Sequence, residues 1–128
     1  VRISSKDSSA VFEKSMTFPT IDIEPRFIFY KEDVLGGTQY NKALPENFQL
    51  NEEELVLRAE PFFFSRENSS RLSYTWPMNG EEIQPQDKPN ILDLRVNPGN
   101  SGSAAIGLEI KNPFSSFQSV AKSLNINY

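Results

Sequence analysis

The chain has 128 residues, of which 38% are hydrophobic and 23% are charged, a composition that fits one globular domain and excludes a disordered or collagen-like chain. Its 17 acidic and 13 basic side chains give a net charge of -4, so we expect no nucleic-acid partner. No stretch approaches the roughly 18–20 apolar residues that span a bilayer, so we expect no membrane insertion of this segment. Histidine and cysteine are both absent, which excludes Ser-His-Asp triads, thiolate nucleophiles, thiolate zinc sites and disulfides. We therefore expect no cofactor. Two of the 17 acidic side chains could converge as the carboxylate pair of a glycosidase, but a sandwich of 128 residues leaves little chain for a cleft, so we expect no enzymatic activity.

The N-terminal segment is predicted to lie apart from the main domain. Residues 1–19 begin with a serine-rich stretch and include the run from Phe12 to Phe18, and they are interpreted as an arm or an extra strand. Residues 20–128 are assigned to one domain. Within it, Ile21 to Ile23 and Phe27 to Tyr30 are predicted as strand pieces separated by Pro25.

A long loop is predicted next, between Tyr30 and the apolar alternation that begins at Leu55. It contains Gly36-Gly37 in its middle, and a turn or short helix is expected around residues 41–44.

The segment from Leu55 onward alternates with the period of a β-strand, and Pro61 predicts a bulge or a strand edge. A helix is the alternative, because Asn51 and Glu54 have the spacing of a capping box. Val56 and the following phenylalanines favour the strand. One predicted face carries Leu55, Leu57, Ala59 and Phe63, and the other carries Val56, Arg58, Glu60, Phe62 and Phe64.

The stretch from Leu72 to Ile83 predicts a hairpin. Alternate residues from Leu72 through Trp76 to Met78 share one face, which indicates that the indole is buried. Asn79-Gly80 then has the residues that a type I′ turn requires.

Three further segments alternate between apolar and polar residues. They are residues 92–96, 104–110 and 120–128, and the turn 97–100 separates the first two. We expect the last strand to pair with residues 104–110. The alternative is an edge position open to strand addition by another chain, against which Lys122 would act. The strand count and spacing thus predict an all-β antiparallel sandwich of seven to nine strands with an N-terminal extension, and the resemblance described next implies that this sandwich is immunoglobulin-like.

The motif Tyr74-x-Trp76-x-x-Asn79-Gly80 resembles the tryptophan strand and hairpin of immunoglobulin-like and PKD-like repeats of bacterial exported or cell-surface proteins. Leu57-x-Ala59, Leu92-x-Leu94, Gly102-x-Ala104-x-Ile106 and the tail from residue 107 to 113 extend this resemblance over residues 53–128. It implies that Ala59 and Ile106 stand where such domains carry a disulfide. It also implies a shared core made of Trp76, Ala59, Ile106, Leu57, Leu94 and Leu108.

The predicted strand faces leave Phe62 and Phe64 outside the sandwich. We expect the N-terminal extension to cover them; the alternative is a surface for a partner or ligand, with Tyr30 as a further aromatic. The acidic run from Glu52 to Glu54, with Glu32 and Asp33 near it, is interpreted as a solvated strand end in preference to a calcium site.

The function expected from this pattern is that of a structural or adhesive module, extracellular or on the cell surface. Its expected partners are neighbouring domains of a longer chain or another surface protein. The alternatives are a carbohydrate-binding module, which would expose aromatic side chains in a coplanar row, and an assembly subunit of a surface fibre.

Overall fold

The computed structural model describes residues 23–115 and 117–128. In this part of the chain there are nine strands and one short 3-10 helix. The elements are β1 (Arg26–Asp33), β2 (Gly37–Ala43), β3 (Asn47–Gln49), β4 (Glu54–Phe62), η1 (Arg66–Arg71), β5 (Ser73–Met78), β6 (Glu81–Ile83), β7 (Ile91–Arg95), β8 (Ser103–Lys111) and β9 (Ser119–Asn127).

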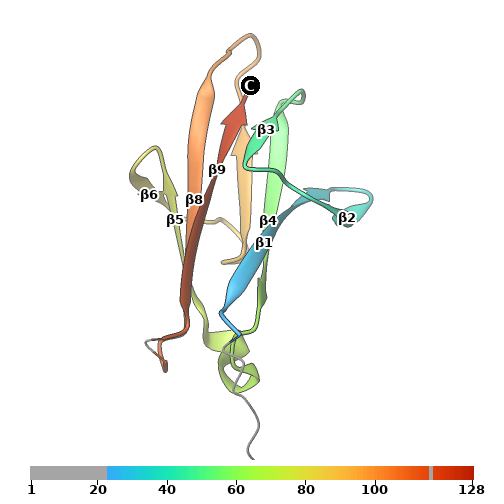
Figure 1. The fold of residues 1–128 in the computed structure, drawn as a ribbon. Coiled ribbons are helices and arrows are strands. Elements are labelled where there is room, and N and C mark those ends of the chain that lie inside the picture. The colour runs from blue at the N-terminus through green and yellow to red at the C-terminus, as the bar shows by residue number, and fades with distance from the viewer. Residues whose placement is uncertain (1–22, 116) are drawn as a thin grey trace, which may run out of the picture.

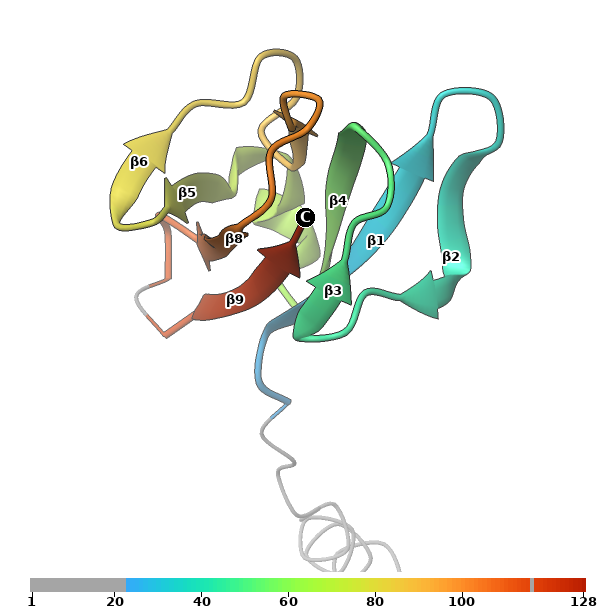
Figure 2. The ribbon, with the colours of Figure 1, turned by 90° about the horizontal axis from the view of Figure 1, so that it is seen from above.

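These strands form two sheets that pack face to face, which confirms the predicted all-β sandwich (Figures 1 and 2). The first sheet has the order β2-β1-β4-β7, and the second has the order β3-β9-β8-β5-β6. The neighbours β1-β4-β7 and β9-β8-β5 have the arrangement of strands A-B-E and G-F-C in immunoglobulin domains. One described pair departs from the antiparallel prediction, because β3 runs parallel to β9.

The core lies between the inner faces of the two sheets. Trp76 on β5 is 0% exposed, its ring centroid lies 6.0 Å from that of Phe29, and its Nε1 donates a hydrogen bond to the carbonyl of Pro89 at 2.8 Å. A buried tryptophan thus has both apolar neighbours and a partner for its N–H. Of the predicted core residues, Ala59, Leu57, Ile106 and Leu108 are also buried, and Leu94 is partly buried and packs against them.

The strand prediction for the segment after Leu55 is confirmed, and the helical alternative is wrong. Leu55, Leu57 and Ala59 are buried while the residues between them are only partly buried, as expected of β4 with one face in the core. The predicted hairpin also forms, because Asn79 and Gly80 have φ angles of 52° and 89°, which lie in the left-handed region that a type I′ turn requires.

The C-terminal strand occupies an interior position in its sheet. β9 pairs along its length with β8, from Ser103 opposite Asn127 to Lys111 opposite Ser119. Its other side pairs with β3 only at residues 125–127, so within the described residues the segment 119–124 of β9 has no strand partner on that side.

The region between Tyr30 and Leu55 was predicted as a loop, and this prediction is wrong. β1 continues to Asp33, and a hairpin leads into β2, which extends through residues 41–43 in place of the expected turn or helix. Residues 23–25 form no strand, so the piece expected to precede Pro25 is not observed there. The extra strand expected at Phe12 to Phe18 lies outside the described residues, and η1 was not anticipated.

Tyr74 makes the stability of this fold sensitive to alkaline pH. Burial of its hydroxyl raises its pKa above the ordinary value of 10.0, and the charge of Glu60 adds to the shift. Because the folded state holds this proton more tightly than the unfolded state, the protonated hydroxyl contributes to the free energy of unfolding. This contribution is complete below pH 10 and is lost as the pH rises through the folded pKa. We expect the free energy of unfolding of Tyr74→Phe to fall less steeply above pH 10 than that of the parent chain. Urea titrations at several pH values measure this, and identical slopes would contradict it.

Candidate functional site

Exposed phenylalanines gather at one end of the sandwich. At this end β4 leads into η1, β1 begins, and the β8–β9 loop turns (Figure 1). Phe62 is 38% exposed, Phe63 51%, Phe114 60% and Phe117 93%. We call this set of four side chains the aromatic pole. Exposed apolar side chains at one end of a domain are candidates for an interaction site, and within this set the rings of Phe62 and Phe63 are neighbours.

A change in backbone direction presents the first two rings. Phe63 has a φ of 65°, a left-handed conformation that is rare for a bulky side chain. The turn directs Phe63 outward, and Phe64 packs against the core. The sequence prediction of Phe63 inside and Phe64 outside is therefore wrong, because it extended the alternation of β4 through this turn. The guanidinium of Arg26 lies over the Phe63 ring, 5.3 Å from its centroid.

Phe63→Gly is expected to stabilise the domain by about 1 kcal/mol, because glycine adopts positive φ without the steric penalty of a Cβ atom. Thermal or urea unfolding measures the change. Phe63→Ala is the matched control, since it removes the same ring but keeps the strained backbone, and it should not stabilise. Equal stabilities of the two variants would contradict a strained Phe63.

A buried polar network holds the other two rings. Asn112 is 3% exposed; its Nδ2 donates to Gln118 Oε1 at 2.7 Å, and its Oδ1 accepts from the backbone N–H of Phe114 at 3.0 Å. Gln118 Oε1 also accepts from the backbone N–H of Ser65 at 3.1 Å, which ties the loop to the start of η1. Buried amides are stable only when their hydrogen bonds are satisfied, so this network fixes the loop that displays Phe114 and Phe117.

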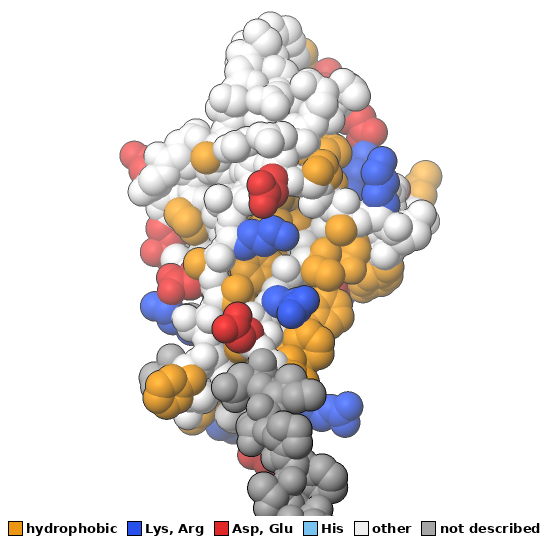
Figure 3. Space-filling model, viewed as in Figure 1, with side chains coloured by type: hydrophobic (Ala, Val, Ile, Leu, Met, Phe, Trp, Pro, Cys, Tyr) orange, Lys and Arg blue, Asp and Glu red, His pale blue; other side chains and the backbone are white. Residues whose placement is uncertain are grey.

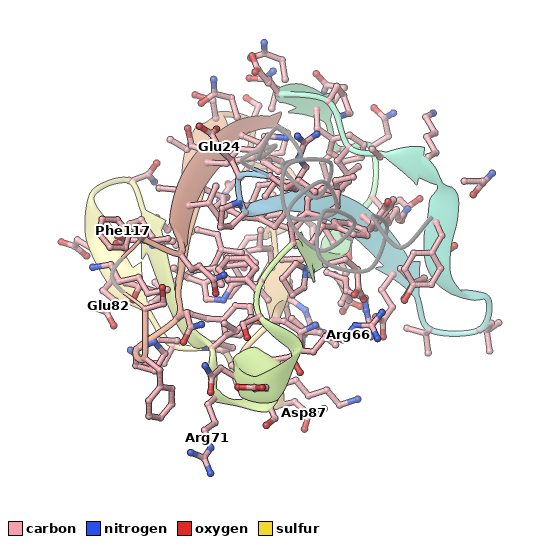
Figure 4. All side chains as sticks on the ribbon, turned by 60° about the horizontal axis from the view of Figure 1, so that its bottom comes forward. Glu24, Arg66, Arg71, Glu82, Asp87 and Phe117 are labelled. Atoms are coloured by element: carbon pink, nitrogen blue, oxygen red, sulfur yellow. The ribbon has the colours of Figure 1, made fainter. Side chains whose placement is uncertain are left out.

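Arginine side chains surround the pole. Arg66 and Arg71 mark the two ends of η1, and the guanidinium of Arg71 lies 5.5 Å from the centroid of the Phe114 ring. Figure 4 shows Arg66, Arg71 and Phe117 extending outward at this end of the molecule. The space-filling view shows hydrophobic side chains protruding at the lower left, where the β8–β9 loop lies (Figure 3). Cation–π contacts keep Arg26 beside Phe63 and Arg71 beside Phe114.

The opposite end of the sandwich contains an apolar cleft of about 230 Å³. We call it the end cleft. It opens beside the β7–β8 loop, and Asn79, Arg95 and Asn97 contribute its polar lining. Its main apolar walls are Leu50, Met78, Leu94, Val96, Ile106 and Ile126.

The structure does not bring together the three aromatic residues proposed as a ligand surface. Phe62 lies at the pole, Phe64 packs inward, and Tyr30 is 8% exposed on β1. The neighbouring rings of Phe62 and Phe63 are tilted by 50° at a centroid distance of 6.4 Å. Phe62, Phe64 and Tyr30 therefore do not form the exposed coplanar row that binding to a sugar requires.

All but one of the acidic side chains considered for calcium lie in ion pairs, the exception among the described residues being Glu53. Lys31 Nζ lies 2.8 Å from Glu52, Arg95 pairs with Glu54, and Arg58 Nη1 lies 3.1 Å from Glu32. In the part of the chain that the structure describes, no group of three potential metal-ligating side chains occurs. These ion pairs fit the interpretation of the acidic run as a solvated strand end.

Phe114 and Phe117 were missed by sequence reasoning. The available signal was the presence of Phe114 directly after Asn112-Pro113 and of a second phenylalanine three positions later, where a turn is expected to carry small or polar residues.

Within residues 23–115 and 117–128, no helix has the length and apolar character that crossing a membrane requires. Comparisons with protein families, curated proteins and solved structures give no match to this chain.

Proposed function

We propose that this chain is a non-enzymatic structural and adhesive module of the immunoglobulin-like type, belonging to an exported or cell-surface protein, and that it contacts other proteins through the aromatic pole. The placement outside the cell rests on the resemblance to bacterial repeats. The observation that carries the contact surface is the group of four exposed phenylalanines at one end of the packed sandwich.

Two features of the pole support an interaction role over incidental exposure. Phe63 is exposed by a strained backbone, and Phe114 and Phe117 are displayed by a loop that a buried asparagine holds in place. Strain of this kind is worth roughly 1–3 kcal/mol, and it persists most often at functional positions. Burial of each ring against a partner would return roughly 1.5–3 kcal/mol.

The geometry favours a protein partner over a sugar. Stacking on a pyranose needs a flat aromatic row, whereas the rings of Phe62 and Phe63 are tilted. A protein surface accommodates tilted rings in separate pockets, and arginine beside aromatic residues is the composition of interaction hot spots. The expected partners are neighbouring domains or another surface protein.

Adhesion between coated beads tests this function. Beads carrying the 128-residue chain are mixed with beads carrying the same chain, fibrinogen, fibronectin or serum albumin, and aggregation is followed by light scattering. We expect adhesion to at least one coating other than albumin, and its loss in the double variant Phe63→Ser/Phe117→Ser. The double variant Val34→Ser/Leu35→Ser is the control. Val34 and Leu35 are 89% and 100% exposed, at the hairpin between β1 and β2, away from the pole.

Adhesion that disappears equally in the control pair would show non-specific hydrophobic contact. Absence of adhesion to every coating would contradict the proposed function, as would binding on a glycan array that the pole variant abolishes.

A further inference from the structure

We infer that the partner of the aromatic pole is the end cleft of a second copy of this chain, so that copies associate head to tail. This inference rests on the proposed function and names the partner of the same surface.

The two surfaces have complementary shapes. Phe117 is 93% exposed and extends from its loop as a single apolar side chain (Figure 4). The end cleft is lined mainly by apolar side chains, with Asn79, Arg95, Asn97 and Asn100 as its polar part, and has a volume of about 230 Å³. That volume is below the range of roughly 300–1,000 Å³ that is typical of small-molecule sites. The cleft therefore suits one or two side chains.

The charges around the two surfaces are also complementary. At the pole, Arg26 and Arg71 lie against the exposed rings, and η1 carries Arg66 and Arg71 with Glu67 in its first turn. At the other end, Glu52 and Glu53 line a shallow depression that shares Leu50, Val96 and Tyr128 with the end cleft.

The acidic run retains negative charge after its ion pairs are counted. Glu52 pairs with Lys31 and Glu54 with Arg95. Among the described residues, Glu53 has no ion-pair partner, so this carboxylate is available to an arginine of another copy. Opposite charges at the rim of an interface speed encounter and fix orientation.

The positions of the two surfaces determine the kind of assembly. The pole lies where β4 ends and β8 meets β9, and the end cleft lies where β7 ends and β8 begins, which are opposite ends of the sandwich in Figure 1. A contact between two different surfaces is heterologous, and at opposite ends of an elongated domain it leads to an open chain. Association would use the ends of the sandwich and leave its strand edges unused.

Sedimentation velocity of the full chain over a concentration series tests this inference. We expect the average mass to rise with concentration, and to rise less at about 0.5 M salt than at about 0.05 M, because salt screens exposed charges. The pole variant Phe117→Ser and the cleft variant Ala104→Trp should each weaken self-association at least about tenfold. Ala104 lines the end cleft and is partly buried.

Mixing the two variants separates a heterologous contact from a symmetric one. Phe117→Ser retains an intact cleft, and Ala104→Trp retains an intact pole. An equimolar mixture should therefore form dimers but nothing larger, although each variant alone stays monomeric. Melting curves establish that both variants fold; if Ala104→Trp does not, Glu53→Lys weakens the same end at an exposed position. Val34→Ser/Leu35→Ser should associate like the parent chain.

Three results would overturn the inference: a parent chain that stays monomeric up to about 1 mM, a mixture that forms no dimer, or association that begins only after residues 1–22 are deleted. The last result would indicate that the chain's own N-terminal segment occupies the pole. Pole-dependent adhesion to fibrinogen or fibronectin without self-association would leave the proposed function standing and reject only the second copy as partner.

Discussion

Trp76→Ala is expected to lower the free energy of unfolding by about 3–5 kcal/mol, the range for removing a large buried aromatic side chain. Trp76 is 0% exposed and contacts core side chains of both sheets. Its indole also donates a hydrogen bond to Pro89, which holds the segment before β7. Because domains of this size have a total stability of roughly 5–15 kcal/mol, the variant should be largely unfolded at 37 °C.

Trp76→Phe separates the two contributions of this side chain. It keeps an aromatic ring in the core and loses the indole N–H, so the Pro89 carbonyl loses its partner, which costs roughly 1–3 kcal/mol. Urea unfolding followed by far-ultraviolet circular dichroism suits both variants, since the chain has a single tryptophan and fluorescence would be lost. Unchanged cooperative unfolding of Trp76→Ala would contradict the assignment of Trp76 to the core.

The segments predicted correctly from sequence are those with one face in the core. In β4 and β8, buried residues recur at every second position over most of the strand, and the same period is present in their sequences. This alternation arises because burial selects apolar residues on one face only. The Asn79-Gly80 turn was predictable for a separate reason, since few residue pairs adopt its backbone conformation.

β2 and β3 carry no such signal. All of β2 is exposed or only partly buried, so its sequence, Gly-Thr-Gln-Tyr-Asn-Lys-Ala, has no apolar face. β3 has only three residues and is positioned by pairing with β9, which is about 80 residues away in sequence. Backbone pairing with a distant strand creates β3, and a local pattern does not record it, whereas β2 forms by hairpin pairing with β1 and lacks only the apolar alternation that would have indicated a strand.

The aromatic pole was predicted in part, through Phe62. Phe63 was placed inside because the alternation was carried past Pro61, whereas one residue of positive φ reverses the direction of the side chains that follow. Phe114 and Phe117 are displayed through the contact of Gln118 with Ser65, and the sequence separation of this pair hides the contact from local reasoning. The site is thus set partly by a local backbone turn at Phe63 and partly by the long-range hydrogen bond between Ser65 and Gln118.

Ile106→Ala is expected to destabilise the domain by about 2–5 kcal/mol, and Ile106→Val by only about 0.5–1.5 kcal/mol. Ile106 is 0% exposed on β8, opposite Met78 on β5 and Leu124 on β9. It also forms part of the wall of the end cleft, so the loss of its side chain would extend the cleft into the core. The cost arises from the cavity as well as from the lost apolar contact.

A substitution at Ala59 tests whether Ala59 and Ile106 face each other at the two positions where immunoglobulin-like domains carry a disulfide. Both residues are fully buried, on β4 and β8 of facing sheets. If their side chains meet, Ala59→Val alone overpacks the core and costs roughly 1–3 kcal/mol. In the Ile106→Ala background the same change fills the cavity and restores stability. Urea unfolding of the four proteins gives the coupling energy, which should be at least about 0.5 kcal/mol. Additive effects would indicate that the two positions do not face each other and that the resemblance to disulfide-bearing domains fails at this pair.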